Sequence, residues 1–260
     1  MSHYFEGRYY KHQKDGQTLC LIAGKADGGP FIQVITNTHV WQYDSLAGCQ
    51  IDTKGIRLDL PPQIKGAVRY GPYTPLKGDI MGPFQYLPMQ CRHEVVSMGH
   101  TLEGGFLVDG RMLDLSGGRG YIEGDRGRSF PNAYLWLHCN DFSQPLSIMA
   151  SVADIPFVGF HFMGCICAIH YKGRKIRLAT YRGVHIHHAG RDGLTLAQGR
   201  YRLRVDIGAH AALPLKAPRK GQMVDTIHES NCASARFRLW ESGALLFDLA
   251  SCNTSFECTL

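Results

Sequence analysis

Two carboxylates and an arginine near the middle of the chain are well suited to proton transfer. Glu123 and Asp125 lie two positions apart in the segment Gly120–Pro131, so in a strand their side chains share a face. Neighbouring carboxylates raise the proton affinity of one member, and Arg128 could hold Asp125 ionised and leave Glu123 as the acid. The alternative is structural, with Asp125 paired to Arg128 as a clasp between two parts of the chain. We predict Glu123, Asp125 and Arg128 as catalytic residues, with the structural clasp as the alternative interpretation.

Residues in two other segments are predicted to bind a substrate. Glu6 and Arg8 share one strand face, where an exposed ion pair is the alternative, and Tyr9 lies on the opposite face. Tyr134 and Trp136 share a face of a later strand. They could form an aromatic wall, although packing in a core is the commoner fate of such side chains.

Two histidines are further candidates for substrate binding. His161 stands between two phenylalanines in an apolar strand, where it could transfer a proton or serve as a hydrogen-bonded core residue. His93 precedes Glu94 and follows the proline-rich stretch Tyr70–Pro88. We expect that stretch to be an ordered loop on the surface or at the mouth of a pocket, because its prolines exclude a central strand.

The sequence predicts neither a metal site nor a cofactor. Cys165 and Cys167 share a face, as do His185 and His187, but the spacing completes no set of four ligands. There is no P-loop, dinucleotide fingerprint or GxSxG motif. Nine cysteines without a CxxC pair favour reduced thiols.

Strand patterns dominate the chain. Gly55–Leu60 alternates apolar and charged residues, and Asp109-Gly110 joins two apolar runs as in a tight hairpin. Gly221–Ser230 is the best candidate for a short helix. The sequence therefore predicts an all-β, antiparallel fold with few short helices.

A weak internal repeat indicates two similar halves. Tyr9–His12 and Tyr134–His138 are aromatic-rich strands, and each is followed by a polar turn and an apolar strand. The glycine-rich stretch Gly117–Gly127 lies between the two copies. We place one domain at residues 1–122 and the other at residues 123–260.

Composition limits the classes of function. The chain has 260 residues, 44% of them hydrophobic, and a formal charge of +6, yet its basic clusters accompany no nucleic-acid-binding motif. We therefore predict no nucleic-acid partner. No apolar run approaches the roughly 20 residues of a membrane helix, and the start lacks the apolar core of a secretory signal. We expect a cytoplasmic protein.

Several segments together resemble the tocopherol-cyclase-like family, over nearly the whole chain. They are Tyr4–Gln13, Met81–Phe84, Met89–Glu94, Gly120–Pro131, Gly159–Cys167 and Arg177–Tyr181. The resemblance implies two tandem lipocalin-like barrels and, from characterised members, closure of a chromanol ring on a prenylated quinol without a cofactor. Relatives of similar architecture hydrate carotenoid double bonds. Arg8 stands where related proteins commonly carry tryptophan.

These observations lead to one main hypothesis and two alternatives. The main hypothesis is a cyclase or isomerase that protonates an alkene of an apolar small molecule inside a dry barrel pocket. A carrier of an apolar ligand and a hydratase of isoprenoid double bonds are the alternatives. A peripheral contact with a membrane could supply the substrate, and the sequence leaves the oligomeric state open.

Overall fold

The computed structural model describes residues 3–157 and 159–260, and these residues form two consecutive antiparallel sheets. The strands of the first half are β1 (Phe5–Lys14), β2 (Gln17–Ala26), β3 (Gly29–Thr36), β4 (Val40–Tyr43), β5 (Cys49–Asp52), β6 (Gly55–Leu60), β7 (Ile64–Tyr70), β8 (Cys91–Val108), β9 (Arg111–Asp114) and β10 (Arg119–Gly127). The strands of the second half are β11 (Tyr134–Cys139), β12 (Leu146–Phe157), β13 (Phe160–Tyr171), β14 (Arg174–Ala179), β15 (His185–Gly190), β16 (Gly193–Gln198), β17 (Tyr201–Ile207), β18 (Leu213–Arg219), β19 (Gln222–Glu241) and β20 (Ala244–Cys258). The described helices are two short 3-10 turns, η1 (Gly82–Tyr86) and η2 (Thr180–Arg182).

The two sheets share one strand order, which confirms the predicted repeat. The first runs β4-β3-β2-β1-β10-β8-β7-β6-β5 and the second runs β14-β13-β12-β11-β20-β19-β17-β16-β15. The sheets differ in the extra strand that pairs with the longest strand of each. In the sequence, β9 comes after β8, whereas β18 comes before β19. The predicted fold class, all-β with two tandem lipocalin-like antiparallel units and few short helices, is confirmed.

The chain passes from the first sheet to the second between Gly127, the end of β10, and Tyr134, the start of β11. The domain boundary proposed between residues 122 and 123 falls inside β10, a few residues before this change of sheet. The helix expected at Gly221–Ser230 is wrong, because this segment is the start of β19 and pairs with β18.

Each curled sheet is filled by its own side chains. Tyr10, Leu21 and Phe106 belong to the cluster of the first half, and Leu196 and Phe237 to that of the second. Phe106 and Phe237 are fully buried. These clusters fill most of both interiors, and the open end of the first one holds a pocket of about 520 Å³ whose lining includes Glu6, Tyr10 and Cys49.

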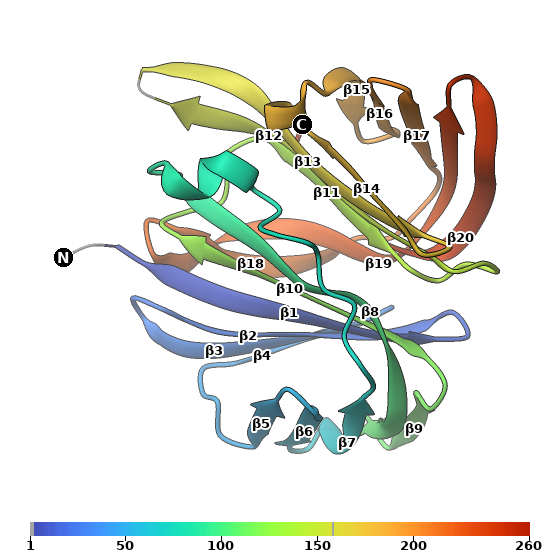
Figure 1. The fold of residues 1–260 in the computed structure, drawn as a ribbon. Coiled ribbons are helices and arrows are strands. Elements are labelled where there is room, and N and C mark those ends of the chain that lie inside the picture. The colour runs from blue at the N-terminus through green and yellow to red at the C-terminus, as the bar shows by residue number, and fades with distance from the viewer. Residues whose placement is uncertain (1–2, 158) are drawn as a thin grey trace.

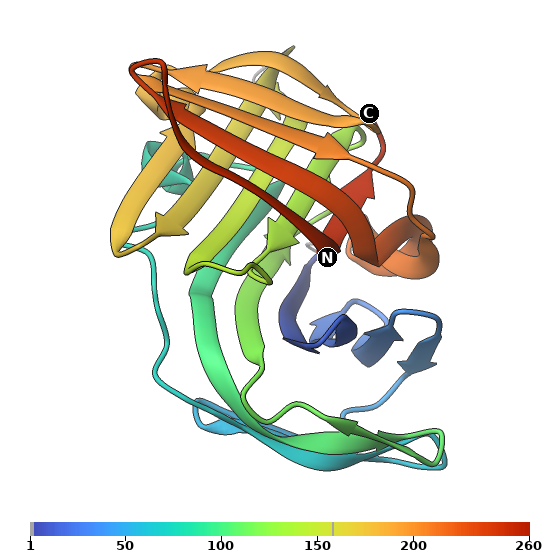
Figure 2. The same cartoon turned by 90° about the vertical axis from the view of Figure 1, so that its right-hand side faces the viewer.

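The outer faces of the two sheets meet in a third cluster. Its members come from both halves and include Tyr9, Tyr121, Trp136 and Met149. Tyr121 stacks on His138 with ring centroids 3.5 Å apart. Figure 1 shows the first half below the second, with β1 and β10 close to β18 and β19, and Figure 2 shows the two curled sheets end-on.

The proline-rich connection from β7 to β8 crosses from the first half to the second. The Arg177 guanidinium donates a hydrogen bond to the backbone oxygen of Asp79 at 2.6 Å, and the Tyr181 hydroxyl donates one to that of Ile80 at 3.0 Å. This segment is the ordered loop predicted from its prolines. Among the described residues, no helix is long and apolar enough to span a bilayer.

Packing of the two interiors can be tested by mutation. Phe106→Ala and Phe237→Ala should each lower the free energy of unfolding by about 3–5 kcal/mol, because each leaves a cavity in a close-packed core. Met112→Ala, at a side chain that is 68% exposed, should change it by no more than about 0.5 kcal/mol. Urea denaturation followed by circular dichroism measures all three. Losses as small as the control's would show that the interiors are not close-packed.

Candidate functional site

A largely apolar cavity of about 180 Å³ lies between the two halves. The first half contributes residues of β1, β2, β3, β8 and β10, and the second contributes residues of β11, β12, β13, β18, β19 and β20. The connecting segments add Met81, Phe84, Met89, Phe130 and Pro131. Because neither half encloses this space alone, the site depends on their association.

Strand alternation places the polar residues in this cavity. Tyr9 of β1 and Glu123 of β10 are cross-strand partners, and both line the cavity. Asp125 lies two residues after Glu123 on the same face, as the sequence predicts. Tyr134 and Trp136 line the cavity from β11.

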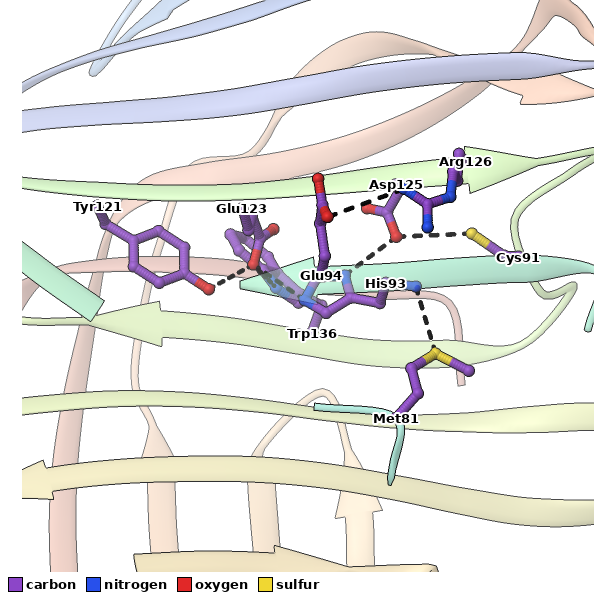
Figure 3. Close-up of polar contacts among 9 residues, drawn as sticks. All are labelled: Met81, Cys91, His93, Glu94, Tyr121, Glu123, Asp125, Arg126 and Trp136. Carbon is purple, nitrogen blue, oxygen red and sulfur yellow. Dashed lines mark hydrogen bonds and ion pairs between the residues drawn. The ribbon is translucent and has the colours of Figure 1, made fainter. Parts of the chain in front are cut away.

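His93 lies between the two predicted carboxylates (Figure 3). Its Nδ1 is 3.0 Å from Asp125 Oδ1 and its Nε2 is 3.3 Å from Glu123 Oε2. The second contact lacks hydrogen-bond alignment and is an electrostatic approach. Burial opposes charge on the imidazole, but Asp125 and Glu123 outweigh it and raise the pKa of His93 well above its usual value. The raised pKa favours the protonated form of the His93 imidazole between the two acids.

Glu123 accepts further hydrogen bonds through the same oxygen. The Tyr121 hydroxyl donates to Glu123 Oε2 at 2.5 Å and the Trp136 indole Nε1 donates to it at 3.2 Å. Glu123 Oε2 thus accepts two hydrogen bonds beside the His93 ring, so the structure holds this oxygen as an acceptor rather than as the proton donor predicted from sequence.

The second half supplies two more buried carboxyl groups. Glu229 of β19 and Glu257 of β20 are cross-strand partners that line the cavity. The Tyr9 hydroxyl donates to Glu229 Oε1 at 2.7 Å, and the Tyr134 hydroxyl donates to Glu257 Oε1. Burial raises the pKa of Glu229 to about 7, with Tyr9 opposing the shift and Glu123 adding to it. Burial, reinforced by the other carboxylates, raises the pKa of Glu257 well above its usual value.

Sequence reasoning missed both of these acids. Glu229 fell in the segment read as a helix, and Glu257 lies in the last strand, whose polar residues were not examined by face. Alternation in Ser255-Phe256-Glu257 was the available signal, because it separates the apolar side of β20 from its polar side.

Three of the predicted site residues lie outside this cavity lining. Glu6 is half-buried and approaches Lys25 at 3.2 Å, not Arg8 as the expected ion pair required. Arg128 is exposed just beyond the end of β10. It does not form the predicted clasp, because Asp125 pairs instead with His93, its cross-strand partner on β8.

His161 is the third of these residues. It is exposed and 3.1 Å from Asp154, so the core position expected for it is wrong. The cause is that β14 pairs with β13 only from Ile166 onward, which leaves the start of β13 beyond the rest of the sheet.

The same group of residues has the donor types of a metal site. His93, Glu123 and Asp125 each offer a ligand atom within 4.8 Å of the others. Three such ligands suit a divalent cation, which would have to displace the proton that the raised pKa of His93 favours. The absence of a metal therefore stays a prediction.

All nine cysteines are free, as predicted.

Comparison with known proteins identifies the fold and no family. No family model and no curated protein matches the sequence. Crystal structures of CghA, one of them with Sch210972, superpose with a TM-score of 0.64 at 9% and 10% identity, covering 100% of this chain and 89% of theirs. A Nitrosomonas europaea protein named as a candidate AttH, NE1406, gives a TM-score of 0.51 at 10% identity, covering 98% of this chain and 91% of its own.

Protonation of Glu229 should make folding depend on pH. Its raised pKa means that the folded state binds the extra proton between pH about 4.5 and 7, so stability is greatest below this window and falls as pH rises through it, by up to about 3 kcal/mol. Glu229→Gln should remove this part of the dependence. Urea denaturation at a series of pH values compares the two proteins, and parallel profiles would contradict the assignment.

Proposed function

We propose that this chain is a cofactor-independent cyclase or isomerase that protonates a carbon–carbon double bond of an apolar small molecule held between its two halves. One observation carries the proposal. Two buried carboxyl groups with raised pKa values, Glu229 and Glu257, face the same apolar cavity as the hydrogen-bonded side chain of Glu123. An acid and a base are thus available to one bound ligand.

The first step is proton donation. Glu229 is the preferred donor because its pKa of about 7 leaves it protonated near neutrality while it can still release the proton. The carboxyl proton moves to one alkene carbon, the π bond breaks, and a tertiary carbocation forms at the other carbon. The Tyr9 hydroxyl, 2.7 Å from Glu229 Oε1, stabilises the carboxylate that remains.

Ring closure follows by internal capture. A hydroxyl oxygen of the ligand forms a bond to the cation, and its proton passes to Glu123, so that the product is an isomer of the substrate. His93, held by Asp125, balances the charge of Glu123 before this transfer. Proton exchange with solvent then restores both carboxyl groups.

The lining protects the cation during this step. Trp136 packs edge-on against Tyr9 with centroids 5.5 Å apart, and both rings face the cavity. Aromatic faces stabilise positive charge, and an apolar lining excludes the water that would otherwise capture the cation. Water entering here would turn the same protonation into hydration, which is the hydratase alternative.

The resemblance to the tocopherol-cyclase-like family supports the choice of a prenylated quinol as ligand class. Its one visible departure, Arg8, does not line this cavity; its guanidinium approaches Glu94 at 2.7 Å. The departure therefore leaves the proposed chemistry intact. The CghA structure with Sch210972 supports ligand binding by this architecture.

Turnover of a prenylated quinol should depend on the two acids. Glu229→Gln and Glu123→Gln should each lower kcat by about 10²–10⁴-fold, because each removes one proton-transferring group at nearly constant shape. Formation of the cyclised isomer is measured by chromatography, and ligand binding by quenching of tryptophan fluorescence.

A matched control is Glu94→Gln, an exposed acid on β8 beside His93, which should retain full turnover. Tight binding without product in the wild-type protein would instead identify a carrier. Unchanged turnover in both cavity variants would contradict the assignment of these acids.

Turnover should also survive dialysis against EDTA. The proposed steps use carboxyl groups only and require no metal at His93, whose part in them is to balance the charge of Glu123. Loss of activity that a divalent cation restores would replace this network with a metal centre at His93, Glu123 and Asp125.

A further inference from the structure

Apolar side chains outside the cavity gather around its mouth. Four segments frame this opening, at residues 83–89, 128–131, 160–163 and 218–224, and each contributes at least one residue to the lining. We call these four segments the mouth rim. In Figure 1, η1 lies at the same side of the molecule as the end of β12 and the start of β13.

The mouth rim exposes large apolar residues that no part of the fold needs. Tyr86 is 82% exposed, Val224 is 57% exposed and Phe160 is 54% exposed. Phe160 lies where β13 pairs only with β12, so the hairpin carries it away from the sheet. Holding such side chains in water is unfavourable, and together they mark an interaction surface.

A row of aromatic rings connects this surface with the cavity. The centroids of Phe160 and Phe162 are 6.4 Å apart, and those of Phe162 and Phe84 are 5.9 Å apart. Phe162 and Phe84 line the cavity, whereas Phe160 faces outward. An apolar molecule can therefore pass from the outer surface to the acids along a continuous apolar path.

The four segments of the mouth rim contain basic residues, Arg128, Arg219 and Lys220, together with His161, and no aspartate or glutamate. Outside them, Asp154 approaches His161 at 3.1 Å and Asp27 lies against Gly221. Arg219 pairs with Asp225, just outside the rim, while Arg128 and Lys220 are exposed and have no ion-pair partner among the described residues. Exposed aromatic rings beside unpaired cations match the chemistry of an anionic lipid surface.

We propose that the mouth rim docks on the surface of an anionic lipid bilayer, and that the cavity takes its apolar ligand directly from the lipid. The inference rests on the proposed function for the apolar nature of the ligand. Rings enter the interface between headgroups and acyl chains, and the cations contact the headgroups. The ligand then reaches Glu229 and Glu123 without crossing water.

Sedimentation with vesicles tests the docking. The full chain should bind vesicles of mixed phosphatidylcholine and phosphatidylglycerol, bind pure phosphatidylcholine vesicles more weakly, and lose affinity as salt is added. The double variant Tyr86→Ser with Phe160→Ser should bind the mixed vesicles at least about tenfold more weakly, since it removes two inserting rings. Lys220→Glu should weaken binding to the mixed vesicles alone.

The matched control exchanges two equally exposed apolar residues outside the mouth rim. Met112→Ser with Leu245→Ser, at side chains 68% and 52% exposed, should bind like the wild-type protein. Equal loss in both double variants, or no vesicle binding by the wild-type protein, would overturn the docking. So would a dimer in analytical ultracentrifugation that Tyr86→Ser with Phe160→Ser dissociates, because the mouth rim would then be covered by a second copy of the chain.

Turnover in detergent micelles separates this inference from the proposed function. The double variant Tyr86→Ser with Phe160→Ser should convert micellar substrate at the wild-type rate and vesicle-borne substrate more slowly. Micellar turnover without vesicle binding would refute docking alone, whereas vesicle binding without any turnover would refute the enzyme alone.

Discussion

The cost of burying carboxyl groups governs the arrangement at the centre of this protein. Glu229 and Glu257 lie in an apolar cavity where ionisation is unfavourable, and each is held by a tyrosine hydroxyl. Glu123 lies in the same cavity but has an imidazolium and two hydrogen-bond donors beside it. Because the surroundings differ, acids of one type acquire opposite roles within one cavity.

The two halves have separate tasks in producing these surroundings. Their interiors hold close-packed apolar clusters that support each sheet. The first half carries His93, Glu123 and Asp125, and the second carries Glu229 and Glu257. The contact between the two similar halves therefore forms a site that neither half has by itself.

Access to the cavity follows from the same geometry. The cavity is lined by the outer faces of the two sheets and by the connecting segments that contain Met81 and Phe84. Each segment of the mouth rim contributes to this lining and also reaches the outer surface. In the proposed docking, an apolar molecule would enter along the aromatic rings of the rim and reach the acids from there.

The sequence by itself determined the strands, the two similar halves and the pairs of residues that share a face. Alternation with period two depends only on local backbone geometry, so it placed Glu123 with Asp125 and Tyr134 with Trp136 correctly. It could not say which face of each sheet would be enclosed, and the apolar cavity that holds Glu123 and Asp125 lies between the two halves rather than inside one of them.

Only the tertiary structure decided that His93 rather than Arg128 holds Asp125, and that Glu229 and Glu257 join the site. These contacts join residues far apart in the chain through strand register and the docking of two sheets, and no local pattern encodes either.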